Sequence, residues 1–168
     1  MQSRWWTLLG SAVGISLAFA VWQGLARILP ADVSGGLPER LALACAALLP
    51  VVCVLNLMIV VQMRLRVRTG AVDPLAGRDD AWLQVNQRAL TNTVEQLAGF
   101  VPALLALAAG VASGWMRFVV AAGLVFALAR LVFWAGYLLG PLARAPGMAA
   151  TFAINVSTMV GAILVWWP

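Results

Sequence analysis

The most informative feature of this 168-residue sequence is how few ionisable side chains it contains. Only 10% of the residues are charged, and the chain has no histidine. Lysine is missing as well, so all 11 basic residues are arginines. These absences exclude a histidine-based catalytic triad, a histidine metal site and a lysine nucleophile. We therefore expect no metal site.

Cysteine is also scarce. Cys45 and Cys53 lie in one apolar segment, and their spacing corresponds to roughly 12 Å along a helix. That distance is too long for a disulfide between them. Neither residue has a carboxylate beside it, so the sequence predicts two small, buried apolar side chains.

Apolar residues, by contrast, are abundant. The chain is 63% hydrophobic with a mean hydropathy of +0.94, whereas soluble domains are about half apolar and about a quarter charged. The net charge of +5 comes from arginines that lie mostly at the ends of apolar runs. This pattern is typical of orientation in a lipid bilayer rather than of nucleic-acid binding. We predict a single all-α integral membrane protein with no nucleic-acid partner.

Five segments are long and apolar enough to span a bilayer, which takes roughly 20 residues. The predicted helices cover residues 5–29, 41–63, 81–109, 116–139 and 148–167. The first follows Arg4 and resembles a signal peptide, but its apolar run is too long, so we expect a retained helix. It carries Gly10 and Gly14 at a spacing that lets helices approach closely. Residues 30–40, 110–115 and 140–147 are predicted loops, and a basic stretch at 64–70 leads into a polar connector at 71–80.

The arginines also predict an orientation, because positive charge collects in cytoplasmic loops. One side of the predicted topology carries Arg4, Arg64, Arg66, Arg68, Arg78 and Arg144; the other carries Arg27, Arg40 and Arg117. The richer side places the N-terminus in the cytoplasm and the C-terminus outside, in a bacterial inner membrane. Tryptophans near the predicted helix ends would form the interfacial aromatic belt.

Among the polar residues inside the predicted helices, four stand out because they need partners there. Arg88, Asn92 and Glu95 are spaced i, i+4 and i+7, which places them on one helix face. Arg130 lies inside the fourth predicted helix. A charge at bilayer depth costs about 2.5–3.5 kcal/mol on insertion scales. Two interpretations stay open: a structural ion-pair network between helices, or a polar cleft that holds a charged small molecule.

The chemistry of these residues narrows the ligand of such a cleft. Arginine matches carboxylates, a carboxylate pairs with an ammonium group, and asparagine bonds a peptide group in both directions. Several arginines with one asparagine and one glutamate suit a small anionic peptide with a free amine. Glutathione is such a molecule.

Three stretches of the sequence resemble the MAPEG family of membrane-associated proteins in eicosanoid and glutathione metabolism. "RALTNTVE" (88–95) is similar to the family's Arg-x-x-x-Asn-x-x-Glu signature. "VQMRLRVRTG" (61–70) looks like the basic end of the family's first helix. "ARLVFWAGYLLGPLARAP" (129–146) resembles the end of its third helix and the following loop. The resemblance covers residues 41–168 and leaves residues 1–40 as an extra N-terminal helix and loop on a bacterial-type member.

The resemblance implies a four-helix transmembrane domain that assembles as a homotrimer with glutathione between subunits. It implies a glutathione site lined by Arg64, Arg88, Asn92, Glu95, Arg130 and Tyr137. It also implies a catalytic role for Arg144, which would stabilise the glutathione thiolate, since a nearby guanidinium favours the charged form. The expected activity is that of a glutathione-dependent transferase or peroxidase. Its substrate would be a lipophilic electrophile that arrives from the bilayer.

The sequence departs from the family pattern at three points, and these keep other hypotheses open. The extra helix precedes the core, Ala98 stands where the family usually has proline, and Phe133 stands where it has tyrosine. These departures favour a non-catalytic binding or scaffold protein as an alternative. A third hypothesis is a small transporter subunit or structural membrane protein in which buried charges only join helices.

Overall fold

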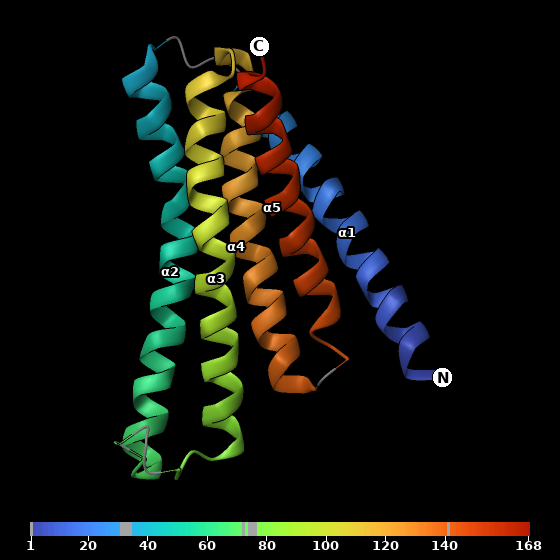
Figure 1. Cartoon of the computed structure of the whole chain (residues 1–168), viewed down its shortest axis with the longest axis vertical. Coiled ribbons are helices and arrows are strands. Elements are labelled where there is room, and N and C mark those ends of the chain that lie inside the picture. Colours follow the sequence, from blue (N-terminus) through green and yellow to red (C-terminus); the bar gives the residue numbers. More distant parts are fainter. Residues whose placement is uncertain (1, 31–34, 72, 74–76, 141) are drawn as a thin grey trace.

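A computed structural model shows the chain as long helices that run roughly along one axis (Figure 1). It describes residues 2–30, 35–71, 73, 77–140 and 142–168, with side chains from Trp5 onward. The elements are α1 (Gln2–Ile28), α2 (Leu37–Thr69), α3 (Ala81–Gly110), the 3-10 turn η2 (Ser113–Trp115), α4 (Met116–Leu139) and α5 (Ala145–Trp166). Within these residues there is no strand, and five helices are long and apolar enough to cross a membrane. The prediction of an all-α integral membrane protein with an additional N-terminal helix is confirmed.

The helices α2 and α5 begin earlier than the sequence predicts, and proline explains both differences. α2 begins at Leu37 and α5 at Ala145, inside segments predicted as loops, and each has a proline in its first turn. The first amide of a helix has no intrahelical partner, so proline loses nothing there. α2 also runs on through the basic stretch to Thr69, where Gly70 stops it in a left-handed conformation (φ 69°).

The helices α2 to α5 pack as a four-helix bundle, and α1 lies against α4 and α5 on its outside. Figure 1 shows α1 inclined to the other helices and diverging from α5 towards the N-terminus. The end of α2, the start of α3, the end of α4 and the start of α5 all lie towards the same end of the molecule as the N-terminus. The connections on which the orientation prediction depends therefore gather at one end.

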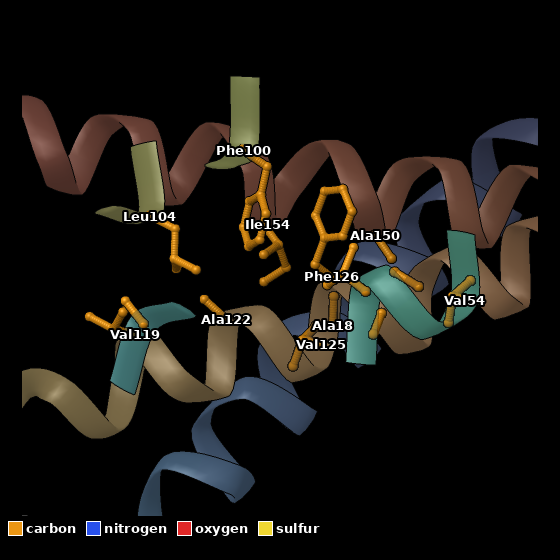
Figure 2. Close-up of a cluster of buried hydrophobic side chains, with 14 of the residues drawn as sticks. Ala18, Val54, Phe100, Leu104, Val119, Ala122, Val125, Phe126, Ala150 and Ile154 are labelled. Atoms are coloured by element: carbon orange, nitrogen blue, oxygen red, sulfur yellow. The ribbon is translucent and has the colours of Figure 1, made fainter. Parts of the chain in front are cut away.

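Small and aromatic side chains fill the bundle interior (Figure 2). Phe100 of α3 and Phe126 of α4 stack with their ring centroids 4.1 Å apart. Gly123 of α4 lies so close to Ala47 of α2 that an added Cβ would overlap the Ala47 carbonyl group. In a membrane, close backbone approach of this kind supplies much of the helix association, because lipid tails are as apolar as leucine.

Buried amides also join the helices. Asn86 of α3 donates to the Met58 carbonyl (3.2 Å) and to Gln62 Oε1 (2.7 Å), both of α2. Its own Oδ1 accepts from Trp134 Nε1 of α4 at 2.8 Å, so one buried amide connects three helices. Asn155 of α5 donates to the backbone carbonyl of Gln96 and to its side-chain oxygen.

The two cysteines are free and exposed at the protein surface. The prediction that they are buried is wrong, while the prediction that they do not pair with each other is confirmed. The physical reason lies in the solvent: a small apolar side chain is as compatible with lipid as with a protein interior, so hydropathy alone does not distinguish the two surroundings.

Candidate functional site

A cavity of about 690 Å³ lies where α4 ends and α5 begins. Four of the predicted site residues line it: Arg88 and Asn92 of α3, Tyr137 of α4, and Arg144 just before α5. The apolar part of the wall comes from side chains of α4, α5 and the turn between them: Phe133, Leu142, Ala145, Met148, Ala149 and Phe152. The cavity thus combines two guanidinium groups, an amide and a phenol with a large apolar surface.

Arg144 is held at the cavity wall by the tight turn between α4 and α5. An added Cβ at Gly136 would overlap the Ala143 carbonyl, so the turn folds directly onto the end of α4. The Arg144 guanidinium carbon lies 4.5 Å from the centroid of the Tyr137 ring, a distance at which a cation is attracted to an aromatic face. Because stacking leaves the N–H groups unused, this half-buried guanidinium retains donors for an anion.

Arg130 is fully buried and does not line the cavity. Its Nε and Nη2 donate to Thr93 Oγ1 at 3.1 and 2.8 Å, and Nη1 lies 3.5 Å from Thr151 Oγ1. Its guanidinium carbon lies 4.0 Å from the Phe133 ring centroid. Both threonine hydroxyls donate to backbone carbonyls of their own helices, which leaves their lone pairs free to accept from the arginine.

Asn92 connects this buried arginine to the cavity. Its Oδ1 accepts from Arg130 Nη2 at 3.2 Å, and its Nδ2 donates to Glu95 Oε2 at 3.4 Å. These two contacts fix which way the amide points. Arg130 therefore supports two cavity residues from behind, Asn92 by a hydrogen bond and Phe133 by its ring face.

Two further predicted site residues, Arg64 and Glu95, also lie outside the cavity lining, and unlike Arg130 both are exposed. Glu95 is at the middle of the 30-residue α3. Arg88 lines the cavity but is also exposed on α3. Among the residues described, the single ion pair is Arg66–Asp79 (3.3 Å). An Arg88–Glu95 pair, which the structural-network hypothesis expects, is not formed.

Sequence reasoning missed two cavity residues on α1, Thr7 and Ser11. Both are small and polar, and their i, i+4 spacing places them on one face of a helix that is otherwise mostly apolar. That spacing was a usable signal. It says which side of α1 is polar, but not that this side meets α4 and α5.

The sequence model of the MAPEG family matches residues 42–164, about three quarters of the chain. The match begins near the start of α2 and ends within α5, so it includes the whole four-helix bundle apart from its ends and excludes α1. No curated protein and no solved structure matches the chain.

Proposed function

The chain belongs to the MAPEG family, and on that basis we propose that it is a glutathione-dependent transferase or peroxidase that acts on lipophilic electrophiles. Glutathione is the co-substrate, and it binds in the cavity between α3, α4 and α5. The observation that carries the proposal is the composition of the cavity wall. Two arginines, an asparagine and a tyrosine converge there, and the lining contains no carboxylate.

The charge of this wall suits glutathione. The peptide has two carboxylates and one ammonium group, so its net charge is negative before the thiol ionises. Arg88 and Arg144 have no hydrogen-bond partner among the described residues and can each bind a carboxylate or thiolate. Asn92, already oriented by Arg130, presents an amide edge for a peptide bond. Glu95, bonded to Asn92, is placed next to the cavity rim as a partner for the ammonium group.

Arg144 has the position required to stabilise a thiolate. It is half-buried, stacked on Tyr137 and bordered by apolar side chains. Each unit by which a guanidinium lowers the pKa of a thiol requires about 1.4 kcal/mol of preferential stabilisation of the anion. In transfer, the thiolate sulfur forms a bond to an electrophilic carbon. Either a leaving group departs from that carbon, or the sulfur adds to a conjugated double bond whose π bond breaks, and the resulting carbanion takes a proton from solvent. In peroxide reduction, the sulfur takes one oxygen and releases an alcohol, and a second glutathione then displaces water to give the disulfide.

We further propose that the active form is a homotrimer. Glu95 and Arg88 are exposed on α3 of the single chain, although a charge facing lipid costs about 2.5–3.5 kcal/mol. A neighbouring copy placed over this face would remove the charges from lipid and close the cavity between subunits. The arginine-rich end would face the cytoplasm of a bacterial inner membrane, and the lipophilic substrate would enter from the bilayer.

Purified protein in detergent allows a direct test. Glutathione should raise the melting temperature, and the protein should conjugate 1-chloro-2,4-dinitrobenzene in a reaction that Arg144→Ala abolishes. Arg78→Ala, which removes an arginine at the same end of the molecule but outside the cavity, is the matched control. If glutathione has no effect on the melting temperature and Glu95→Gln behaves like the parent, the proposal is wrong.

A second candidate function is supported by Phe133. This residue lines the cavity beside Tyr137, with the two rings perpendicular at 5.3 Å, and offers no hydroxyl to a thiol or substrate. The same geometry also suits a protein that binds glutathione or a lipid without catalysing a reaction. Stabilisation by glutathione without any conjugation or peroxide reduction would favour this binding function over the enzyme.

A further inference from the structure

The helix α1 lies outside the part of the chain that matches the family, yet it contributes to the cavity. Thr7 and Ser11 line the same space as Arg144 and Tyr137. Ser11 is half-buried, whereas Ser16, five residues further along α1, is exposed and outside the lining. One face of α1 is therefore part of the cavity wall, and the opposite face is exposed at the protein surface.

Two glycines bring α1 against the start of α5. An added Cβ at Gly10 would lie 3.6 Å from the Cβ of Ala145, and one at Gly14 would come within 2.6 Å of the Pro146 Cα and overlap its carbonyl oxygen. Ordinary side chains at Gly14 would have to push α1 away from α5. By contrast, an added Cβ at Gly24 of the same helix meets nothing within 4 Å. The closest approach of the α1 backbone to α5 thus lies in the half of α1 that reaches the cavity.

The contact continues beyond the cavity along an apolar seam. A second hollow of about 130 Å³ lies between α1, α4 and α5, lined among others by Leu17, Val21, Leu128 and Ala150. It begins one helical turn after Ser11, on the far side of the contact between Gly14 and Pro146. α1 therefore covers the groove between α4 and α5 both beside the cavity and deeper in the membrane.

From these contacts we propose that the first half of α1 is a built-in wall of the ligand cavity and that Ser11 determines how large a substituent on the ligand sulfur fits. The identity of the ligand rests on the proposed function. The wall closes the cavity on the side where a bundle without α1 would open to lipid. The small side chain of Ser11 leaves room beside Arg144, and a large one would occupy the space that the electrophile needs.

The test compares two glutathione derivatives that differ in the group on sulfur. Glutathione sulfonate carries a small anionic group, and S-hexylglutathione carries an alkyl chain. In the parent protein both should raise the melting temperature. Ser11→Phe should lower the affinity for S-hexylglutathione roughly tenfold or more, because overpacking at the wall opposes binding. The same substitution should change the affinity for glutathione sulfonate much less. Ser16→Phe, on the lipid face of the same helix, should leave both affinities as in the parent.

The outcomes separate the two proposals. If neither derivative stabilises the parent, the proposed function fails and the inference fails with it. If both derivatives stabilise the parent but Ser11→Phe weakens them equally or not at all, only the inference about α1 is wrong.

A disulfide gives a second measurement of the same wall. In a protein with Cys45→Ala and Cys53→Ala, the pair Gly10→Cys and Ala145→Cys has the Cβ separation that a disulfide requires. Oxidation should close this pair within one chain, detected by the mass of the alkylated protein. Gly24→Cys with Ala145→Cys is the matched pair that should stay reduced. Glutathione sulfonate should raise the melting temperature of the oxidised protein as much as that of the reduced protein. Failure of the disulfide to form, or loss of this stabilisation on oxidation, would overturn the proposal.

Discussion

Replacing Thr93 by valine tests the role of the buried arginine most directly. Thr93 is fully buried, and its hydroxyl oxygen accepts from both Nε and Nη2 of Arg130. Valine has nearly the same shape but no acceptor, so the substitution removes two of the four hydrogen bonds that the guanidinium makes in the protein. Asn92 and Thr151 would then be its only partners among the described residues.

The magnitude follows from the charge of the donor. A hydrogen bond to a charged group contributes about 1.5–3 kcal/mol, and leaving a buried donor unpaired costs at least about 1–3 kcal/mol. Because hydrogen bonds between membrane helices average less, about 0.6 kcal/mol, we expect Thr93→Val to lower the free energy of unfolding by about 2–3 kcal/mol. For a chain of this length that corresponds to roughly 4–12 °C in melting temperature.

Thr158 provides the matched control. It is also fully buried, and its hydroxyl donates to the Ile154 carbonyl four residues earlier, as Thr93 does to Ala89. No arginine contacts it, so Thr158→Val should change the free energy of unfolding by less than about 0.5 kcal/mol, as expected for loss of a local back-bond that contributes little. Unfolding by sodium dodecyl sulfate in mixed micelles measures both variants. Equal effects of the two substitutions would refute a special role for Thr93 in holding Arg130.

Three further substitutions test other contacts of the structure. Gly14→Val should displace α1 and lower the melting temperature by several degrees, while Gly24→Val, which meets no neighbour, should not; equal melting curves would contradict the packing of α1. Glu95→Gln should raise the glutathione concentration needed for the same thermal stabilisation roughly tenfold, because a charged partner of the ligand is lost. The melting temperature of the free protein should stay unchanged or rise. Trp134→Phe removes the donor to the buried Asn86 oxygen and should cost about 1 kcal/mol of unfolding free energy, with no effect on glutathione binding; a binding defect would show that this network reaches the cavity.

The fold was largely predictable because the bilayer allows few solutions. Long apolar runs must be helices when no water is present to satisfy the backbone, and the five predicted segments correspond to α1 to α5. The errors lie at the ends, where Pro38 and Pro146 mark helix starts rather than loops. Proline has both roles, and the local sequence does not decide between them.

The residues that line the cavity were predictable in part, because spacing along a helix shows which residues share a face. Spacing along α3 shows that Arg88 and Asn92 share a side, and the structure places both on the cavity wall. Spacing does not show which residues of a helix face line a cavity and which are exposed. It therefore gave no reason to expect that Glu95 lies outside the lining while Arg88 and Asn92 belong to it. The contribution of Ser11 depends on which neighbour covers α1, and that is a property of tertiary packing rather than of the helix.

The structure also separates arginines that are alike in the sequence. Arg130, Arg88 and Arg144 all lie within or beside membrane helices, but only Arg130 directs its N–H groups to protein acceptors. Its charge is spread over a planar group that hydroxyls, an amide and an aromatic ring can surround, which a compact ammonium group would tolerate less well. Arg88 and Arg144 line the cavity wall without a hydrogen-bond acceptor among the described residues, and the described lining contains no carboxylate. On the proposed function, these two sets of free donors suit an anion with two separated negative groups. The placement of the donors, rather than the number of arginines, is what supports a peptide such as glutathione as the proposed ligand.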